Sequence, residues 1–323
     1  MTGKELRLVF MGTPDFAVAS LKALVDGGYN VVGVITAPDK PAGRGKKLHQ
    51  SAVKQYAVEN NLNVLQPEKL KNPEFLAELE VLQADLQVVV AFRMLPKAVW
   101  MMPRMGTFNL HGSLLPQYRG AAPLNWAVIN GETKTGVTTF LLDHEIDTGK
   151  ILFKKEIDIW ENDTVGTIHD SLMGIGAKLV METVDALAEG NYKAIPQSEL
   201  MDEAYIKHAP KIFKEDCKID WSKDIETIRN LIRGLSPYPT AWSTLVHTDS
   251  GKETPTKLFF AIQVNGNTNE APGTIETDGK TFIKVACKDG WLQITDLQIA
   301  GKKRMRVDDF LRGFQQIGEY KFV

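Results

Sequence analysis

LRLVFMGTPDFAVASLKALVDGGYNVVGVIT, residues 6–36, indicates the fold class of this chain. It opens with an apolar run, Leu6–Met11, and continues after a short turn with a helical pattern to about Asp26. A second apolar run, Val31–Thr36, follows. Strand, helix and strand in this order form the unit of a parallel sheet. The first turn holds a single glycine, Gly12, so the G-x-G-x-x-G fingerprint is absent and a nicotinamide cofactor is disfavoured.

The alternation of strand and helix patterns continues to about residue 190. Helices are expected at 51–60, 73–82, 122–130 and, after the cap Asn162-Asp163-Thr164, up to about Gly190. Strands are expected at 63–66, 84–92, 106–111, 136–142 and 150–157. Because the run Ala84–Phe92 is almost continuously apolar, it predicts a strand covered on both faces. The basic stretch Ala37–Gln50, with two prolines and two glycines, predicts a loop.

The last third of the chain has a different pattern. A helix is expected at 224–235, and five short apolar runs between 241 and 297 are separated by Gly, Asp and Asn turns. This spacing predicts a small barrel of the oligonucleotide-binding type. The predicted fold is therefore α/β: a Rossmann-like, mostly parallel sheet in the N-terminal domain and a C-terminal OB-like β-barrel. Expected boundaries are 1–190 for the first domain, 191–205 for a linker and 206–323 for the second.

Composition limits the classes of function. The chain has 323 residues, of which 43% are hydrophobic and 24% are charged, as in an ordinary globular protein. No run approaches the roughly 20 apolar residues that span a membrane, and the N-terminus enters a strand without a secretory pattern. Cys217 and Cys287 lie seventy residues apart and outside any C-x-x-C motif. We therefore expect a cytoplasmic protein without membrane contact, disulfide framework or zinc site.

Two segments carry candidate chemistry: TFNLHGSLLPQYRG at 107–120 and LDHEIDTG at 142–149. Asn109 and His111 are two residues apart, so a strand would point both side chains to the same face. Asp147 lies in a polar loop between two strand-like runs. Each residue alone is explained more simply by structure, as a turn asparagine, a core histidine or a surface acid. The ordered set is unusual, however, and its amide, imidazole and carboxylate suit acyl-type transfer.

Basic residues gather in two short clusters. One comprises Lys40, Arg44, Lys46 and Lys47, and the other Lys302, Lys303, Arg304 and Arg306. Residues 206–323 carry 18 Lys and Arg against 15 Asp and Glu, whereas the chain as a whole has a net charge of −2. A charge run is usually only a solvated face, but such clusters also suit a phosphate backbone. Nucleic-acid contact is the functional alternative.

Four motifs together resemble those of the methionyl-tRNA formyltransferase family, within the wider folate-dependent formyltransferase superfamily. They are FMGTPDFA at 10–17, PDKPAGRGKK at 38–47, NLHGSLLPQYRGAAP at 109–123 and DTGKIL at 147–152. The resemblance runs the length of the chain and includes AGKKRM at 300–305. The N-x-H, SLLP and D-T-G set alone would indicate only the superfamily, while the basic loop and basic C-terminal domain favour the tRNA enzymes.

The resemblance implies an enzyme that moves a formyl group from 10-formyltetrahydrofolate to the α-amino group of methionyl-tRNA. It implies that Asn109, His111 and Asp147 form the catalytic triad. In the mechanism that we expect, Asp147 orients His111. Neither a covalent acyl-enzyme nor a metal is expected, since Ser113 and the two cysteines lack an adjacent activating base in sequence. The implied folate-contacting turn is Ser113, Leu114, Leu115 and Pro116. The resemblance implies Arg44 as a tRNA-binding residue. From the two basic clusters, the further tRNA-binding residues that we expect are Lys40, Lys46, Lys47, Lys302, Lys303 and Arg304. Phe16 would line a methionine pocket, and the protein is expected to act as a monomer.

This sequence departs from the family pattern at Ala91–Pro96, AFRMLP, and at Gln117, where a basic residue is frequent. Two other functions stay open. One is a formyltransferase or hydrolase that acts on a small amine or on water. The other is an RNA-binding protein built on the barrel, with a folate domain that has lost its activity. Activity with glycinamide ribonucleotide or a nucleotide sugar would favour the first of these, and formyl transfer to methionyl-tRNA would decide against the second.

Overall fold

The structure is a computed structural model that describes residues 1–42 and 47–323, without the side chains of Ala42, Lys47 and Gln315. Its contacts divide the chain into two compact units. The N-terminal unit comprises Met1–Pro123, Thr135–Ile157 and His169–His208. The C-terminal unit comprises Leu124–Lys134, Asp158–Ile168 and Ala209–Val323. The functional boundaries expected from the sequence, 1–190, 191–205 and 206–323, stay a prediction.

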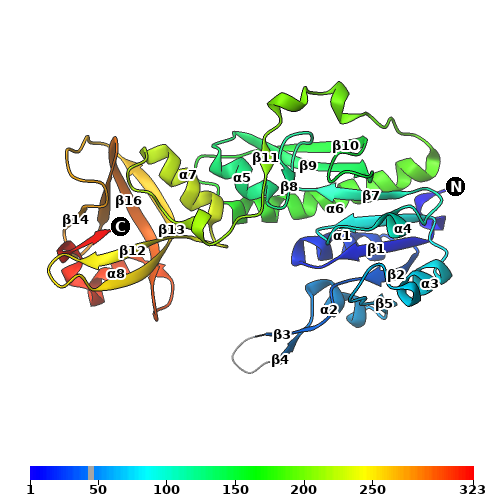
Figure 1. Cartoon of the computed structure of the whole chain (residues 1–323), viewed down its shortest axis with the longest axis horizontal. Coiled ribbons are helices and arrows are strands. Elements are labelled where there is room, and N and C mark those ends of the chain that lie inside the picture. The colour runs from blue at the N-terminus through cyan, green and yellow to red at the C-terminus, as the bar shows by residue number, and fades with distance from the viewer. Residues whose placement is uncertain (43–46) are drawn as a thin grey trace. The chain divides into compact units, whose positions relative to one another are not determined.

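A seven-stranded sheet forms the centre of the N-terminal unit, in the order β10-β9-β7-β6-β1-β2-β5 (Figure 1). The strands are β1 (Leu8–Gly12), β2 (Val31–Ile35), β5 (Val64–Leu65), β6 (Leu86–Val90), β7 (Thr107–His111), β9 (Lys134–Leu141) and β10 (Ile151–Asp158). The five strands from β7 to β5 are parallel, and β9 runs antiparallel to β7. The predicted Rossmann-like sheet is confirmed.

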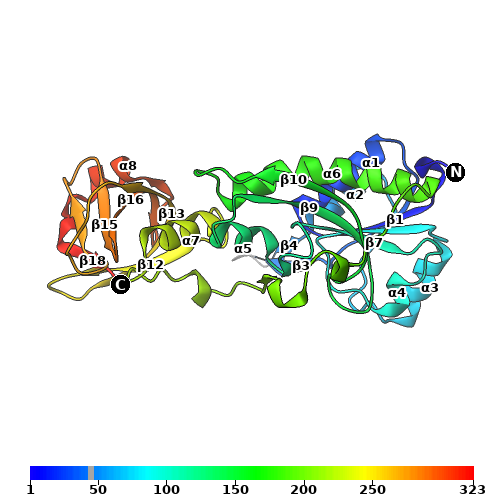
Figure 2. The same ribbon diagram turned by 90° about the horizontal axis from the view of Figure 1, so that it is seen from above.

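Helices cover both faces of this sheet. They are α1 (Asp15–Asp26), α2 (Ala52–Glu59), α3 (Pro73–Val81), α4 (Lys97–Trp100) and α6 (Val165–Glu189). Figure 2 shows α1, α2 and α6 on one face and α3 and α4 on the other. Every residue of β1 and β6 is buried, which explains their continuous apolar sequences. Such a sheet presents its site at the carboxyl ends of the parallel strands.

The C-terminal unit is built on an antiparallel sheet in the order β14-β15-β16-β13-β12-β18, with β17 paired to β16. Its strands are β12 (Ala241–His247), β13 (Glu253–Val264), β14 (Ile275–Thr277), β15 (Ile283–Cys287), β16 (Gly290–Ile299), β17 (Met305–Arg306) and β18 (Tyr320–Phe322). The helices are α5 (Pro123–Ile129), α7 (Ile225–Leu235) and α8 (Val307–Gly313). A bridge from Thr274 to Lys321 brings the two sheet edges together, so the predicted barrel is confirmed as a nearly closed one.

One segment differs from its predicted form, and the predicted linker has local structure. The ends of the predicted loop Ala37–Gln50 form a two-stranded hairpin, β3 (Lys40–Ala42) and β4 (Lys47–His49), because extended backbone there pairs with itself despite the loop-like composition. The segment after α6, predicted as a linker, contains regular local structure. It contains short 3-10 turns, η2 (Gln197–Glu199) and η3 (Glu203–Tyr205), and Ile195 bridges to Ile151 on β10.

Within the described residues, no helix is both long enough and apolar enough to cross a bilayer. The same residues contain no group of three His, Cys, Asp or Glu side chains able to hold a metal ion. Both cysteines are free and buried.

Candidate active site

Strand β7 carries two of the predicted catalytic side chains. It pairs in parallel with the buried β6 and ends at His111, at the carboxyl edge of the sheet. Asn109 and His111 occupy alternate positions and therefore share one face of the strand. His111 is buried, whereas Asn109 is half-buried, and its carboxamide has no hydrogen-bond partner among the described residues. The carboxamide is therefore available to a ligand.

The His111 ring is oriented by a backbone carbonyl. Nε2 lies 2.8 Å from the carbonyl oxygen of Tyr118, which can only accept, so Nε2 must donate. The other nitrogen, Nδ1, lies 3.9 Å from Oδ2 of Asp147. This distance is too long for a hydrogen bond. In this structure Tyr118 supplies the hydrogen bond to the ring, and Asp147 brings a negative charge near Nδ1. The expectation that Asp147 orients His111 stays a prediction.

Asp147 lies in the loop between β9 and β10, in the left-handed region with φ +56°. Its Oδ2 accepts a hydrogen bond of 3.0 Å from the backbone amide of Gly120. Gly149 lets the loop close, since a Cβ there would lie 1.7 Å from the carbonyl oxygen of Leu141. Tyr118 also has a left-handed backbone, with φ +61°. Such conformations are costly for residues other than glycine and gather at functional sites.

The predicted folate turn, residues 113–116, is fixed by hydrogen bonds to other parts of the protein. The Ser113 hydroxyl donates to the Gln117 carbonyl at 2.6 Å, and the Leu115 amide donates to the Thr138 hydroxyl at 3.1 Å. Ser113, Leu115 and Pro116 are buried, and Leu114 is half-buried. The peptide bond before Pro116 is cis. Contact with a ligand would therefore come from the backbone and the exposed part of Leu114. The folate assignment stays a prediction.

Phe16, predicted to line a methionine pocket, is the second residue of α1 and follows the end of β1 by four residues. Its ring lies 5.3 Å from the ring of His169 on α6, measured between centroids. Phe16 is buried and His169 is partly exposed. Since Phe16 follows the carboxyl end of β1, it lies at the same sheet edge as His111. Its role stays a prediction.

The two departures from the family pattern have structural roles. Arg93 donates to the backbone carbonyls of Pro67 and Glu68. The Gln117 side chain accepts from the Lys207 amide at 2.7 Å and donates to the Tyr205 carbonyl at 3.1 Å. Gln117 therefore fastens the segment after α6 to the turn that carries Tyr118.

The predicted tRNA-binding residues are only partly described. Lys40 is exposed on β3. Arg44 and Lys46 lie outside the described residues, as does the side chain of Lys47. In the C-terminal cluster, Lys302 and Lys303 are exposed, but the guanidinium of Arg304 makes two 2.9 Å bonds to Asp296. Arg304 is therefore partly neutralised in this structure.

A second cationic surface on the C-terminal unit was not predicted. The ammonium groups of Lys214 and Lys218 lie 5.6 and 5.8 Å from the ring centroid of Trp242. Both lysines are exposed, and Trp242 is half-buried on β12 with its indole N–H bonded to the Lys214 carbonyl at 2.9 Å. We call these three residues the lysine–tryptophan patch. Cations beside a π face offer both phosphate attraction and base stacking.

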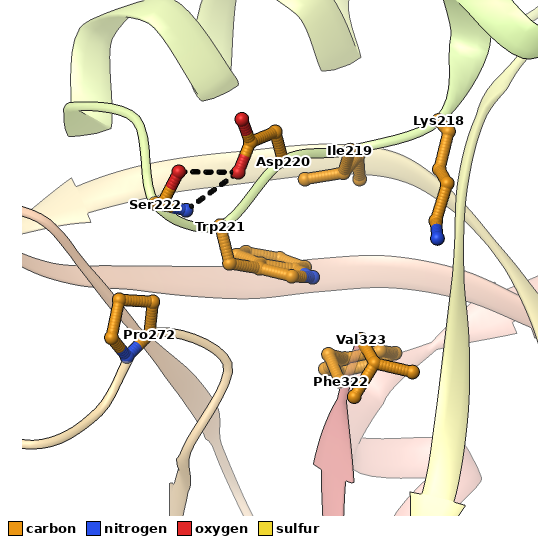
Figure 3. Close-up of a pocket in the computed structure, with 8 residues that line it drawn as sticks. All are labelled: Lys218, Ile219, Asp220, Trp221, Ser222, Pro272, Phe322 and Val323. Carbon is orange, nitrogen blue, oxygen red and sulfur yellow. Dashed lines mark hydrogen bonds between the residues drawn. The ribbon is translucent and has the colours of Figure 1, made fainter.

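A hollow of about 370 Å³ adjoins this patch through Lys218. Figure 3 shows the Trp221 ring between Pro272 and Lys218, with the chain end nearby. Trp221 donates to the Ser243 hydroxyl at 2.9 Å, and Ser222 bonds Asp220 through its hydroxyl and amide. The Ser222 hydroxyl lowers the pKa of Asp220. None of the predicted site residues lines this hollow.

The sequence did not indicate three further residues at the site. Tyr118 acts through its carbonyl and Gly120 through its amide, so their side chains give no signal. Gln197 donates to the backbone of the Asp147 loop from a stretch whose composition predicts a linker. Tyr118 and Gly120 do belong to the sequence motif QYRG at 117–120, but nothing in the motif shows that their backbone groups contact His111 and Asp147.

Sequence comparison decides the family. A family model for the formyl transferase N-terminal domain, described as "Formyl transferase", matches residues 6–184, and one described as "Formyl transferase, C-terminal domain" matches 211–315. Methionyl-tRNA formyltransferase of Parabacteroides distasonis is 61% identical over 99% of both chains, and that of Bacteroides fragilis is 56% identical over the same share. This chain belongs to the methionyl-tRNA formyltransferase family.

Solved structures with the formyltransferase fold are more distant from this family member. HypX from Aquifex aeolicus in complex with tetrahydrofolic acid has a TM-score of 0.63 at 20% identity, covering 96% of this chain and 48% of the other. WlaRD, a sugar 3N-formyl transferase, has a TM-score of 0.63 at 20% identity, covering 92% and 99%. At this identity the likeness shows the fold alone, and it supports the two-part architecture.

Proposed function

We propose that this protein transfers the formyl group of 10-formyltetrahydrofolate to the α-amino group of methionyl-tRNA, giving N-formylmethionyl-tRNA for translation initiation. Relatives at 56–61% identity over nearly the whole chain are named for this activity. The observation that carries the proposal is the group of three polar side chains at one sheet edge. The unpartnered carboxamide of Asn109 lies two residues from His111, and Nδ1 of His111 lies 3.9 Å from the Asp147 carboxylate.

The chemistry requires a stabilised oxyanion. The neutral amine of the acceptor attacks the formyl carbon, a C–N bond forms, and the carbonyl electron pair moves onto oxygen. Collapse of this intermediate breaks the bond to N10 of the folate and restores the carbonyl. The proton lost by the amine is finally delivered to N10, which leaves as the N–H of tetrahydrofolate. Preorganised donors aimed at the oxyanion are usually the largest catalytic contribution.

Asn109 and His111 are the proposed donors. The Asn109 amide can donate without giving up a bond to the protein. Since Nε2 of His111 donates to the Tyr118 carbonyl, Nδ1 can donate to the oxyanion only in the doubly protonated ring. The Asp147 carboxylate would balance that charge and receive the amine proton, directly or through water. We propose no covalent intermediate, because the Ser113 hydroxyl is committed to the Gln117 carbonyl.

The formyl donor is supported by neighbours of the same fold. One is named as a complex with tetrahydrofolic acid, and another as a structure in the presence of dTDP and 5-N-formyl-THF. In this chain the rigid turn at 113–116 would offer backbone groups to the flat pterin ring. Phe16 would contact the methionine side chain. We expect no metal requirement.

Contact with tRNA would come from two separate surfaces. One is the basic segment 40–47, with Lys40, Arg44, Lys46 and Lys47, and the other lies on the C-terminal unit. There the lysine–tryptophan patch complements Lys302 and Lys303, while Arg304 would first have to exchange Asp296 for phosphate. Action as a monomer in the cytoplasm stays our expectation.

The test is incubation of the purified protein with methionyl-tRNA and 10-formyltetrahydrofolate, scoring formyl-methionine after deacylation. Glycinamide ribonucleotide, a nucleotide-linked amino sugar and water are the competing acceptors. Formylation of methionyl-tRNA supports the proposal. Transfer to a small amine alone, or tRNA binding without any transfer, would reject it in favour of one of the other two functions.

A further inference from the structure

The side chain of Gln197 connects the two halves of the candidate site. It begins the short turn η2 and is only 3% exposed. Its Nε2 donates to the carbonyl of Asp147 at 2.8 Å and to that of Gly149 at 2.9 Å. Its Oε1 accepts from Nε of Arg119 at 3.0 Å. Both amide hydrogens and the oxygen of one buried carboxamide are thus bonded within the site.

Each bond reaches a segment that supports a catalytic group. On one side, Asp147 and Gly149 belong to the loop that presents the carboxylate. On the other side, Arg119 lies between Tyr118, whose carbonyl orients His111, and Gly120, whose amide bonds the Asp147 carboxylate. Gln197 therefore bonds the residue between Tyr118 and Gly120, whose backbone groups contact the imidazole and the carboxylate.

The backbone on both sides needs external support. Asp147 and Tyr118 hold left-handed conformations at φ +56° and +61°, which persist in non-glycine residues only where the surroundings fix them. The amide of Tyr118 is fixed by the Lys207 carbonyl at 2.6 Å. Gln197 bonds the carbonyl of Asp147 itself.

A second contact to Arg119 is weaker. Its NH1 pairs with Glu203 at 2.7 Å, but the Glu203 side chain is 69% exposed. An exposed ion pair contributes little, whereas a buried donor left without its acceptor costs much more. The buried bond to Gln197 is therefore the stronger of these two side-chain contacts of Arg119, whose backbone also pairs as β8 (Arg119–Gly120) with β11 (His208–Ala209).

We propose that Gln197 is a positioning residue that sets the relation between Nδ1 of His111 and the Asp147 carboxylate, and this inference rests on the proposed formyl transfer. Gln197 does not touch the reacting atoms. It keeps the Asp147 loop and the Tyr118–Gly120 segment in register, so that the charge near Nδ1 is in place before substrate arrives. A misplacement of about 1 Å in such a site can cost about 100-fold in rate.

Two substitutions of Gln197 distinguish its bond to Arg119 from its two bonds to the Asp147 loop. Gln197→Leu fills the same volume and removes all three bonds. Gln197→Glu keeps an acceptor for Arg119 but loses both donors to the Asp147 loop. We expect kcat to fall about 10- to 100-fold in both, with KM for methionyl-tRNA and for the formyl donor changed less than threefold.

The matched control is Gln87→Leu. Gln87 is also a fully buried carboxamide, but it lies on β6 opposite Thr107, at the start of the strands and away from the site edge. Its Oε1 accepts from the Thr107 hydroxyl at 3.0 Å, and that hydroxyl keeps the Trp100 carbonyl as a second acceptor at 2.8 Å when Gln87 is replaced. The Nε2 of Gln87 has no partner among the described residues. We expect this variant to keep kcat within twofold and its melting temperature close to that of the wild type.

A readout independent of activity is hydrogen exchange at the Gly120 amide, which bonds Asp147 Oδ2. Gln197→Leu should speed this exchange at least tenfold while amides of β6 keep their protection. The inference is overturned if a folded Gln197→Leu protein keeps kcat within twofold, if Gln197→Glu restores wild-type kcat, or if Gly120 exchange is unchanged. Absence of formyl transfer by the wild type would instead reject the proposed function, and Gly120 exchange would still test Gln197.

Discussion

Removal of the Asn109 amide donor is the most direct test of the catalytic geometry. The carboxamide has no protein partner among the described residues, and the side chain is only half-buried on β7. Asn109→Ala therefore breaks no internal hydrogen bond and should leave the stability nearly unchanged. Any loss of rate then reports on substrate chemistry rather than on folding.

The expected size of the loss follows from the role. One preorganised oxyanion donor is worth about 2.7–4 kcal/mol, which corresponds to about 10²–10³ in kcat. The neighbouring His111 remains anchored by the Tyr118 carbonyl, so the second donor survives and residual activity is expected. Asn109→Asp is the sharper variant, because it keeps the shape but places acceptor oxygens where negative charge develops. Its loss should equal or exceed that of alanine.

Single-turnover formylation with saturating methionyl-tRNA and formyl donor gives the chemical rate without product release. Thermal unfolding and direct tRNA binding, measured on the same preparations, should match the wild type. Asn60→Ala is a suitable control, since it removes a carboxamide that bonds Tyr56 at the far end of α2. If Asn109→Asp retained more than a third of the wild-type rate, Asn109 would not be an oxyanion donor.

Three further outcomes are expected. Gly149→Ala should destabilise the protein by about 1–3 kcal/mol and reduce kcat, because its Cβ would lie 1.7 Å from the Leu141 carbonyl; an unchanged melting temperature would contradict this. Lys214→Ala with Lys218→Ala should raise KM for methionyl-tRNA and lower the salt slope of binding by about one per lysine lost, with kcat retained; an unchanged slope would remove the lysine–tryptophan patch from the tRNA surface. Burial raises the pKa of Cys287 to about 12, so little thiolate forms at pH 8 and alkylation of the native protein should be slow by mass spectrometry; rapid labelling would show that the site opens.

The fold could be predicted because its signals are local and repeated. Buried parallel strands such as β6 leave continuous apolar runs, and the short strands of the barrel are separated by clear turn residues. The hairpin of β3 and β4 could not be predicted in this way. Its strands are three residues long and rich in Lys and Pro, and their pairing depends on backbone contact rather than on side-chain pattern.

The site was predictable to the extent that side chains form it. Asn109 and His111 follow from the two-residue period of a strand, which the structure bears out by placing both on β7. Backbone groups leave no such pattern. The Tyr118 carbonyl and the Gly120 amide could therefore be identified only in the folded structure, and so could Gln197, which is fifty residues from Asp147 in sequence.

The left-handed backbone at Tyr118 and Asp147 explains why the hydrogen bonds to His111 and to the Asp147 carboxylate depend on each other. The turn at Tyr118 directs its carbonyl at Nε2 of His111, and the Asp147 carboxylate is held by the Gly120 amide two residues later. Because the imidazole and the acid are thus fastened to the same three-residue segment, a shift of that segment moves both contacts at once. Substitution of His111 or Asp147 removes one group, whereas loss of the support beneath residues 118–120 should disturb both. This is why a buried side chain that touches no substrate is expected to affect kcat more than KM.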